Sequence, residues 1–113
     1  MDIEFLDQDG AHVARIVGDL DGNTAPDAEA RIMEYARQHD RLVLDLAACG
    51  YVSSAGLRVL LMLGKQLKAQ GGRWALAGVS AEIADVMDMT GFSSFFTLCP
   101  DVAAAAQTLS TTP

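Results

Sequence analysis

Hydrophobic and polar positions follow two different periods along the chain. Short runs of β-branched and apolar residues predict strands, and a nearly continuous apolar run before Asp45 predicts a strand buried on both faces of a parallel sheet. Asp9-Gly10, between the first two runs, predicts a hairpin whose loop contains one or two additional residues. The predicted strands are Ile3–Leu6, His12–Val17, Arg41–Leu46, Arg73–Gly78 and Phe95–Leu98.

Between the later strands, apolar residues recur every three or four positions, which is typical of one face of a helix. A serine, threonine or aspartate stands at the start of each such segment, where its side chain is suited to cap free backbone N–H groups. The predicted helices begin at Thr24, cover Ser54–Ala69, run from Ser80 to Gly91 and cover Val102–Leu109.

The order of these elements predicts one α/β domain over residues 1–113, with residues 110–113 as a frayed tail. After the hairpin, strands and helices alternate. This alternation favours a mostly parallel sheet with one antiparallel N-terminal strand, flanked by about four helices. Half of the 113 residues are hydrophobic, which is enough to build the core of a single domain.

Charge and composition exclude several classes of function. Fifteen acidic and eight basic residues give a net charge of −7, which disfavours binding to nucleic acid or to anionic membrane surfaces. The longest apolar run, Val59–Leu63, is too short for membrane insertion, and Met1–Glu4 lacks the basic character of a secretory signal. Cys49 and Cys99 form no CxxC pair, so we expect a cytoplasmic protein with reduced thiols and without metal or cofactor.

Few residues are candidates for catalysis. His12 is expected on a central strand and His39 at a helix end; without a nucleophile motif, packed or surface histidines are the simpler interpretation. Asp19 and Asp21 share a loop, where bonds to the backbone are more frequent than acid–base chemistry or metal binding. Asp45 is expected to hydrogen-bond the loop after its strand. Because phosphate-binding glycine motifs and a nucleophile elbow are also absent, we expect that the chain is not an enzyme.

Two serines, Ser53 and Ser54, stand where a loop becomes a helix. One of them is expected to be the N-cap. Gly56 lies inside the first turn, where glycine costs up to about 1 kcal/mol relative to alanine, and it predicts a close approach of another group to the backbone. A helix N-terminus also favours negative charge, so a serine there is able to carry a phosphate without unfolding its own helix. Plain capping and a phosphorylation switch are both consistent with these residues.

The segment formed by Asp45-Leu46 and Tyr51–Leu57 resembles the signature of STAS domains of the bacterial anti-sigma factor antagonist type. Three further segments agree with this resemblance, which covers essentially the whole chain. They are Gly18–Ala25, Asp88–Phe92, and Phe95–Leu98 with the short alanine-rich helix that follows.

The resemblance implies a regulatory protein that works by partner switching. The unphosphorylated antagonist binds an anti-sigma factor, which is also a serine kinase of the GHKL ATPase type; phosphorylation dissociates the complex, and a PP2C-type phosphatase resets it. By position, the phosphoacceptor is Ser54. Many family members have aspartate at the position of Ser53, which is the second choice. The implied partner-binding residues are Asp21, Gly22, Asn23, Thr24, Ser53, Ser54, Gly56, Leu57 and Arg58.

Two alternatives stay open at this point. Stand-alone STAS proteins also serve as structural subunits, for example on the ATPase of a phospholipid-transport ABC complex, where phosphorylation is not required. The other alternative is an input module that binds a small ligand, although nothing in the sequence indicates a pocket.

Overall fold

The chain opens with an antiparallel hairpin of β1 (Asp2–Gln8) and β2 (Ala11–Val17). The structure is a computed structural model that describes residues 1–91 and 96–110. Gln8 pairs with Ala11, so Asp9 and Gly10 alone form the loop and the expected additional residues are absent from it. Both have positive φ, +54° for Asp9 and +81° for Gly10, which is the conformation of a tight two-residue hairpin turn.

The other strands, β3 (Arg41–Asp45), β4 (Arg73–Ala77) and β5 (Leu98–Cys99), run parallel to β2. Over the described residues, the sheet has five strands in the order β1-β2-β3-β4-β5, which confirms the expected α/β fold. The last strand is shorter and later than predicted, because only Leu98 and Cys99 pair with β4. Phe96 is buried in the core instead, and Phe95 lies outside the described residues.

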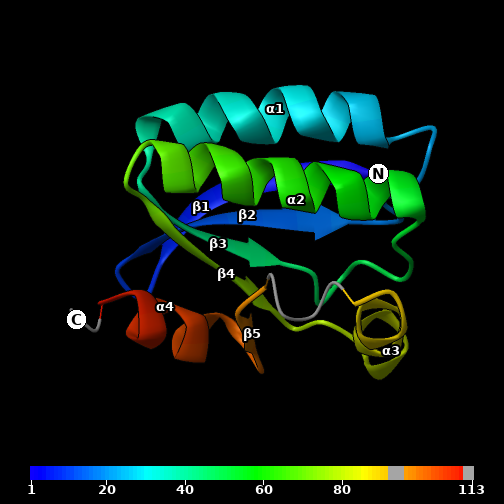
Figure 1. Cartoon of the computed structure of the whole chain (residues 1–113). Coiled ribbons are helices and arrows are strands. Elements are labelled where there is room, and N and C mark those ends of the chain that lie inside the picture. Colours follow the sequence, from blue (N-terminus) through cyan, green and yellow to red (C-terminus); the bar gives the residue numbers. More distant parts are fainter. Residues whose placement is uncertain (92–95, 111–113) are drawn as a thin grey trace.

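Helices cover both faces of the sheet (Figure 1). On one face, α1 (Ala25–Gln38) and α2 (Ser54–Ala69) lie side by side, and α3 (Ala81–Met89) adds Ile83 and Met87 to the same core. On the other face, α4 (Val102–Ser110) packs against small residues of β3 and β4. Ser110 therefore ends a helix rather than belonging to a tail, and residues 111–113 lie outside the described range. No helix in that range has both the length and the apolar character needed to cross a bilayer.

Backbone hydrogen bonds continue between two loops beyond the carboxyl ends of β2 and β3. The N–H of Gly18 donates to the carbonyl of Ala48 at 3.0 Å, and the N–H of Leu20 donates to the carbonyl of Tyr51 at 2.9 Å. The carbonyl of Leu20 in turn accepts from the N–H of Ser53 at 2.9 Å. Leu20 thereby joins the loop before α1 to the loop before α2.

Gly56 lies directly on this junction. A Cβ atom at Gly56 would come within 2.5 Å of the Leu20 carbonyl oxygen and 2.9 Å of a Val52 methyl carbon. Gly56 is also buried, so its missing side chain does not leave an open face for a partner. The close approach expected from the sequence is made by Leu20 of the same chain.

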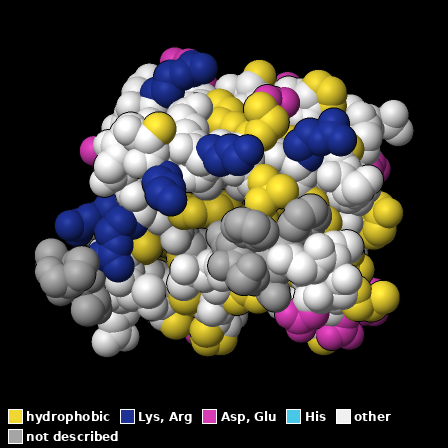
Figure 2. Space-filling model, viewed as in Figure 1, with side chains coloured by type: hydrophobic (Ala, Val, Ile, Leu, Met, Phe, Trp, Pro, Cys, Tyr) yellow, Lys and Arg dark blue, Asp and Glu magenta, His cyan; other side chains and the backbone are white. Residues whose placement is uncertain are grey.

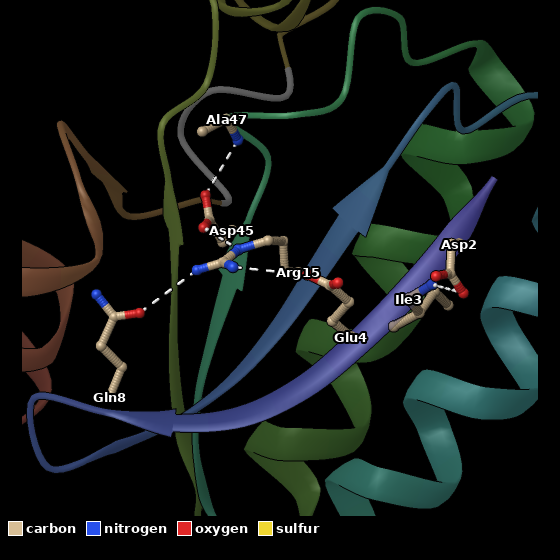
Figure 3. A network of polar contacts seen from close by, with 7 residues as sticks. All are labelled: Asp2, Ile3, Glu4, Gln8, Arg15, Asp45 and Ala47. Atoms are coloured by element: carbon tan, nitrogen blue, oxygen red, sulfur yellow. Dashed lines mark hydrogen bonds and ion pairs between the residues drawn. The ribbon is translucent and has the colours of Figure 1, made fainter.

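Arg15 and Asp45 link neighbouring strands close to the same end of the sheet (Figure 3). The buried carboxylate of Asp45 accepts from Arg15 at 3.1 Å and from the backbone N–H of Ala47 at 3.0 Å. Arg15 also reaches Glu4 at 3.5 Å and Gln8 at 3.4 Å. Asp45 thus hydrogen-bonds the loop that follows β3, as expected, and serves as a structural anchor.

Replacing Gly56 with alanine is expected to destabilise the fold by about 2 kcal/mol, because overpacking against a backbone carbonyl outweighs the better helix propensity of alanine. Urea or thermal unfolding measures the loss. Gly22→Ala is the matched control, since a Cβ at Gly22 meets no atom within 4 Å. A Gly56→Ala variant as stable as the control would contradict the tight junction with Leu20.

Replacing Asp45 with alanine is expected to lower the free energy of unfolding by about 1–3 kcal/mol, because it leaves the Ala47 N–H and one side of Arg15 without their acceptor. Glu4→Gln breaks only an exposed pair and should change stability by less than about 1 kcal/mol. Equal losses in the two variants, measured by urea unfolding, would show that Asp45 does not anchor the loop.

Candidate functional site

Ser53 is the residue that caps α2, which resolves the choice left open by the sequence. Its backbone is extended, with φ −82° and ψ 177°, and its Oγ accepts from the N–H of Gly56 at 3.2 Å. Its carbonyl accepts from the N–H of Leu57 at 2.8 Å. The Ser53 hydroxyl is therefore engaged in holding the first turn of the helix.

Ser54 is the first residue of α2 and is exposed to solvent. Within the described residues, its hydroxyl takes part in no hydrogen bond, in contrast to that of Ser53. It lies among the free N–H groups at the positive end of the helix dipole, where added negative charge is favoured. Of the two serines, Ser54 is the one whose hydroxyl is available for modification.

The loop before α1 is braced by its own side chains. One carboxylate oxygen of Asp21 accepts from the N–H groups of Asn23 at 3.0 Å and Thr24 at 3.2 Å. The Thr24 hydroxyl accepts from the N–H of Asp21 and donates to the carbonyl of Asp19, each at 2.9 Å. Thr24 thus fixes the loop instead of capping α1 with its side chain. Asp21 is committed to its own backbone, and Gly22 and Asn23 are presented to solvent.

The structure brings the sequence-predicted site residues to one end of the molecule, but with different exposure. The Asp21–Thr24 loop and Ser53-Ser54 are adjacent because both loops are bonded to Leu20. Arg58 is exposed, whereas Gly56 and Leu57 are buried and position the helix from beneath. Sequence reasoning missed Leu20, although a lone leucine between the polar residues of this loop was the available signal.

Exposed apolar residues border this end and continue along α2. The Tyr51 side chain, three residues before Ser54, is 54% exposed, and Met62 is 39% exposed on the outer face of α2. Between α1 and α2 runs a shallow groove of about 430 Å³. Its lining residues are Pro26, Glu29, Ala30, Met33, Arg37, Met62 and Gln66.

The histidines lie outside this site, whereas the buried Cys49 belongs to the loop before α2, where its thiol donates to the Tyr51 carbonyl at 3.3 Å. His12 pairs with Leu42 near the amino end of β3, and its Nδ1 lies 2.6 Å from Asp7, whereas the serines follow the carboxyl end of β3. The rings of His12 and His39 lie against each other at a tilt of 42°, with centroids 4.0 Å apart. Burial raises the pKa of the Cys49 thiol. Within the part of the chain that the structure describes, no three potential ligands gather to hold a metal ion.

Known proteins share both the sequence pattern and the fold. Residues 2–105 match the family model of the STAS domain. BtrV of Bordetella bronchiseptica, named as a candidate anti-sigma factor antagonist, is 34% identical over 104 residues, which cover 91% of this chain and 90% of that protein. An anti-sigma factor antagonist from Mycobacterium paratuberculosis is 25% identical, with a TM-score of 0.87 over 97% of this chain and 94% of that one.

A more distant structure shows the same fold. The phosphorylated form of the Bacillus cell fate determinant SpoIIAA is 18% identical, with a TM-score of 0.70 over 95% of this chain and 99% of that one. The strand order, the paired helices α1 and α2, and the match over residues 2–105 all agree. The chain belongs to the STAS domain family.

Proposed function

We propose that this protein is an anti-sigma factor antagonist that works by partner switching. Its unphosphorylated form binds an anti-sigma factor, and phosphorylation of Ser54 releases that partner. The observation that carries the proposal is the exposed, unengaged hydroxyl of Ser54 at the start of α2, beside the braced Asp21–Thr24 loop. The names of the Bordetella relative and of the Mycobacterium structure support the same function.

The modification is a phosphoryl transfer from ATP, catalysed by the partner kinase of the GHKL type. The Ser54 Oγ bonds to the γ-phosphorus while the bond from that phosphorus to the β–γ bridging oxygen breaks. The hydroxyl proton passes to a base on the kinase, and ADP leaves. In the reverse branch, a PP2C-type phosphatase adds water across the phosphate ester, which restores the serine and releases inorganic phosphate. We place both steps in the cytoplasm, which supplies the ATP.

The phosphate acts at the contact surface without unfolding the helix. At neutral pH it adds a charge of about −1.5 to −2 at a position where a helix tolerates anions. Asp19 and Asp21 lie in the adjoining loop, so the phosphate concentrates negative charge on this surface. A partner surface that fits the neutral serine then meets repulsion and a group that is difficult to desolvate.

Two other interpretations, an enzyme and a structural subunit of a larger complex, receive less support. The relatives are named as regulators, which agrees with the expectation that the chain is not an enzyme. A structural subunit of a lipid-transport ABC complex needs no accessible serine at the start of α2, and neither the relatives nor the site geometry favours it.

Ser54→Asp is expected to weaken binding to the native anti-sigma factor by about tenfold or more, because it places a charge at the centre of the contact. Ser54→Ala should bind like the wild type but resist phosphorylation. Incubation with ATP and lysate of the source organism, followed by phosphosite mapping, tests acceptor identity. Calorimetry with the purified partner tests binding. Phosphate on Ser53 alone, or full binding by Ser54→Asp, would refute the assignment to Ser54.

Ser53→Ala is expected to destabilise the protein by about 1 kcal/mol through loss of the α2 cap. Ser80→Ala is the matched control, since Ser80 caps α3 through the same contact, with its Oγ 3.2 Å from the N–H of Ile83. Thermal unfolding should show similar losses for both variants, with Ser54 phosphorylation retained in each. Loss of all phosphate in Ser53→Ala alone would instead make Ser53 the acceptor.

A further inference from the structure

Helix α2 carries an uncompensated positive charge on its outer face. Arg58, Lys65 and Lys68 are all exposed, and the 16 residues of Ser54–Ala69 include no aspartate or glutamate. Figure 2 shows dark blue side chains lying in a row across the face where α2 lies in Figure 1. None of the three forms an ion pair with a described residue, whereas Arg15, Arg31 and Arg37 each do. In a chain of net charge −7, this local excess is notable.

The three cations share one side of the helix with Ser54. At about 100° per residue, Ser54, Arg58 and Lys65 fall within an arc of about 40°, with Met62 and Lys68 on its two flanks. We call Arg58, Met62, Lys65 and Lys68 the basic face of α2. From Arg58 to Lys68 it extends about 15 Å along the helix axis.

The stability of α2 does not explain this face. The helix dipole favours cations only in the last turn, which suits Lys68 but gives nothing to Arg58 in the second turn. Residues three and four positions from Lys65 include no carboxylate, and Lys68 is itself one of them, so the two like charges weakly destabilise the helix. A charge pattern that folding does not require points to a partner.

We propose that the basic face of α2 docks an acidic surface of the protein partner, and that phosphate on Ser54 releases this partner by neutralising Arg58. The inference rests on the proposed function and specifies the chemistry of its partner. Met62 supplies an exposed apolar contact on the flank of the cations, and the groove that it lines extends the contact toward α1. Charge complementarity selects an acidic protein surface. Anionic membranes are less suitable, because three cations are fewer than a membrane-binding cluster normally provides.

Distance limits which cation the phosphate affects. Arg58 lies one helical turn beyond Ser54, about 6 Å along the axis, where positions i and i+4 are neighbours. Its guanidinium is suited to pair with a phosphate on that serine. Lys65 lies about 17 Å from Ser54 along the axis, beyond the Debye length of about 8 Å at physiological salt. The phosphate is therefore expected to act through Arg58 and to leave Lys65 and Lys68 unchanged.

Charge reversal on the basic face provides the main test. The binding partner for this test is isolated first. It is the protein that the wild type retains from lysate and that Ser54→Asp does not retain, and it is purified before affinities are measured. Lys65→Glu is expected to weaken its binding about tenfold and to reduce the dependence of affinity on salt. Arg41→Glu is the matched control, an exposed cation without an ion pair to a described residue and with the same change in net charge. Equal effects of the two variants would overturn the proposal.

A double-mutant cycle tests the role of Arg58. Arg58→Gln alone should weaken binding by about threefold to fivefold, as expected for loss of one exposed charge pair. In that background, Ser54→Asp should weaken binding further by a clearly smaller factor than it does in the wild type. Additive effects would show that the charge at residue 54 does not act through Arg58.

A measurement without the native partner separates this inference from the proposed function. Titration of the ¹⁵N-labelled protein with an octaglutamate peptide at low salt should shift amide signals of α2 in the wild type and in Arg41→Glu, but not in Lys65→Glu/Lys68→Glu. Signal shifts only outside α2, or no shifts at all, would overturn the proposed role of the basic face, even if Ser54 is phosphorylated. If the basic face instead bound anionic phospholipid vesicles, or if sedimentation showed that it joins two copies of this chain, the proposal of an acidic protein partner would be wrong. If no protein distinguishes wild type from Ser54→Asp, the proposed function fails instead.

Discussion

The site depends on the backbone of Leu20. Its N–H and carbonyl bond to Tyr51 and Ser53, which joins two loops that are separated in sequence by all of α1 and β3. The Cα of Gly56 packs closely against the same carbonyl, so the position of the start of α2 relative to the sheet is fixed. Without this contact, the Asp21–Thr24 loop and the two serines would be independent loop ends. With it, they form one surface.

This arrangement divides two tasks between neighbouring serines. Ser53 caps the helix, because its hydroxyl oxygen accepts a hydrogen bond from the N–H of Gly56. Ser54 is exposed, and its hydroxyl forms no hydrogen bond with a described residue. A modification at Ser54 therefore changes the surface and leaves the core intact. The same separation holds along α2, where buried leucines face the sheet and the cations face outward.

The sequence predicted the fold well wherever the signal was local. Helix α2 has the predicted bounds, because serines at its start and Gly71, with φ +75°, after its end are strong local signals. Predictions failed where tertiary pairing decides the outcome. The hairpin loop is shorter than expected because Gln8 and Ala11 pair, and β5 begins only where Leu98 meets Leu76.

The local part of the site was predicted, whereas the part that depends on tertiary contacts was not. The motif around Ser54 is local and was found, but the role of Leu20 and the burial of Gly56 depend on a contact across 36 positions. Net charge alone also concealed the basic face, because the acidic residues lie on other elements. A sum over the chain carries no information about where each charge lies.

The position of Ser54 in a formed helical turn has a consequence for its recognition. Many modified serines lie in extended loops, which an enzyme reads as a linear string of side chains. Here the proposed acceptor is fixed in the first turn of α2, and its spatial neighbours come from a loop about thirty positions earlier in the chain. An enzyme acting on Ser54 must accept a helix end as its substrate. A short peptide copied from this segment would lack both the turn and its neighbours, so we expect an enzyme that modifies Ser54 to require the folded domain.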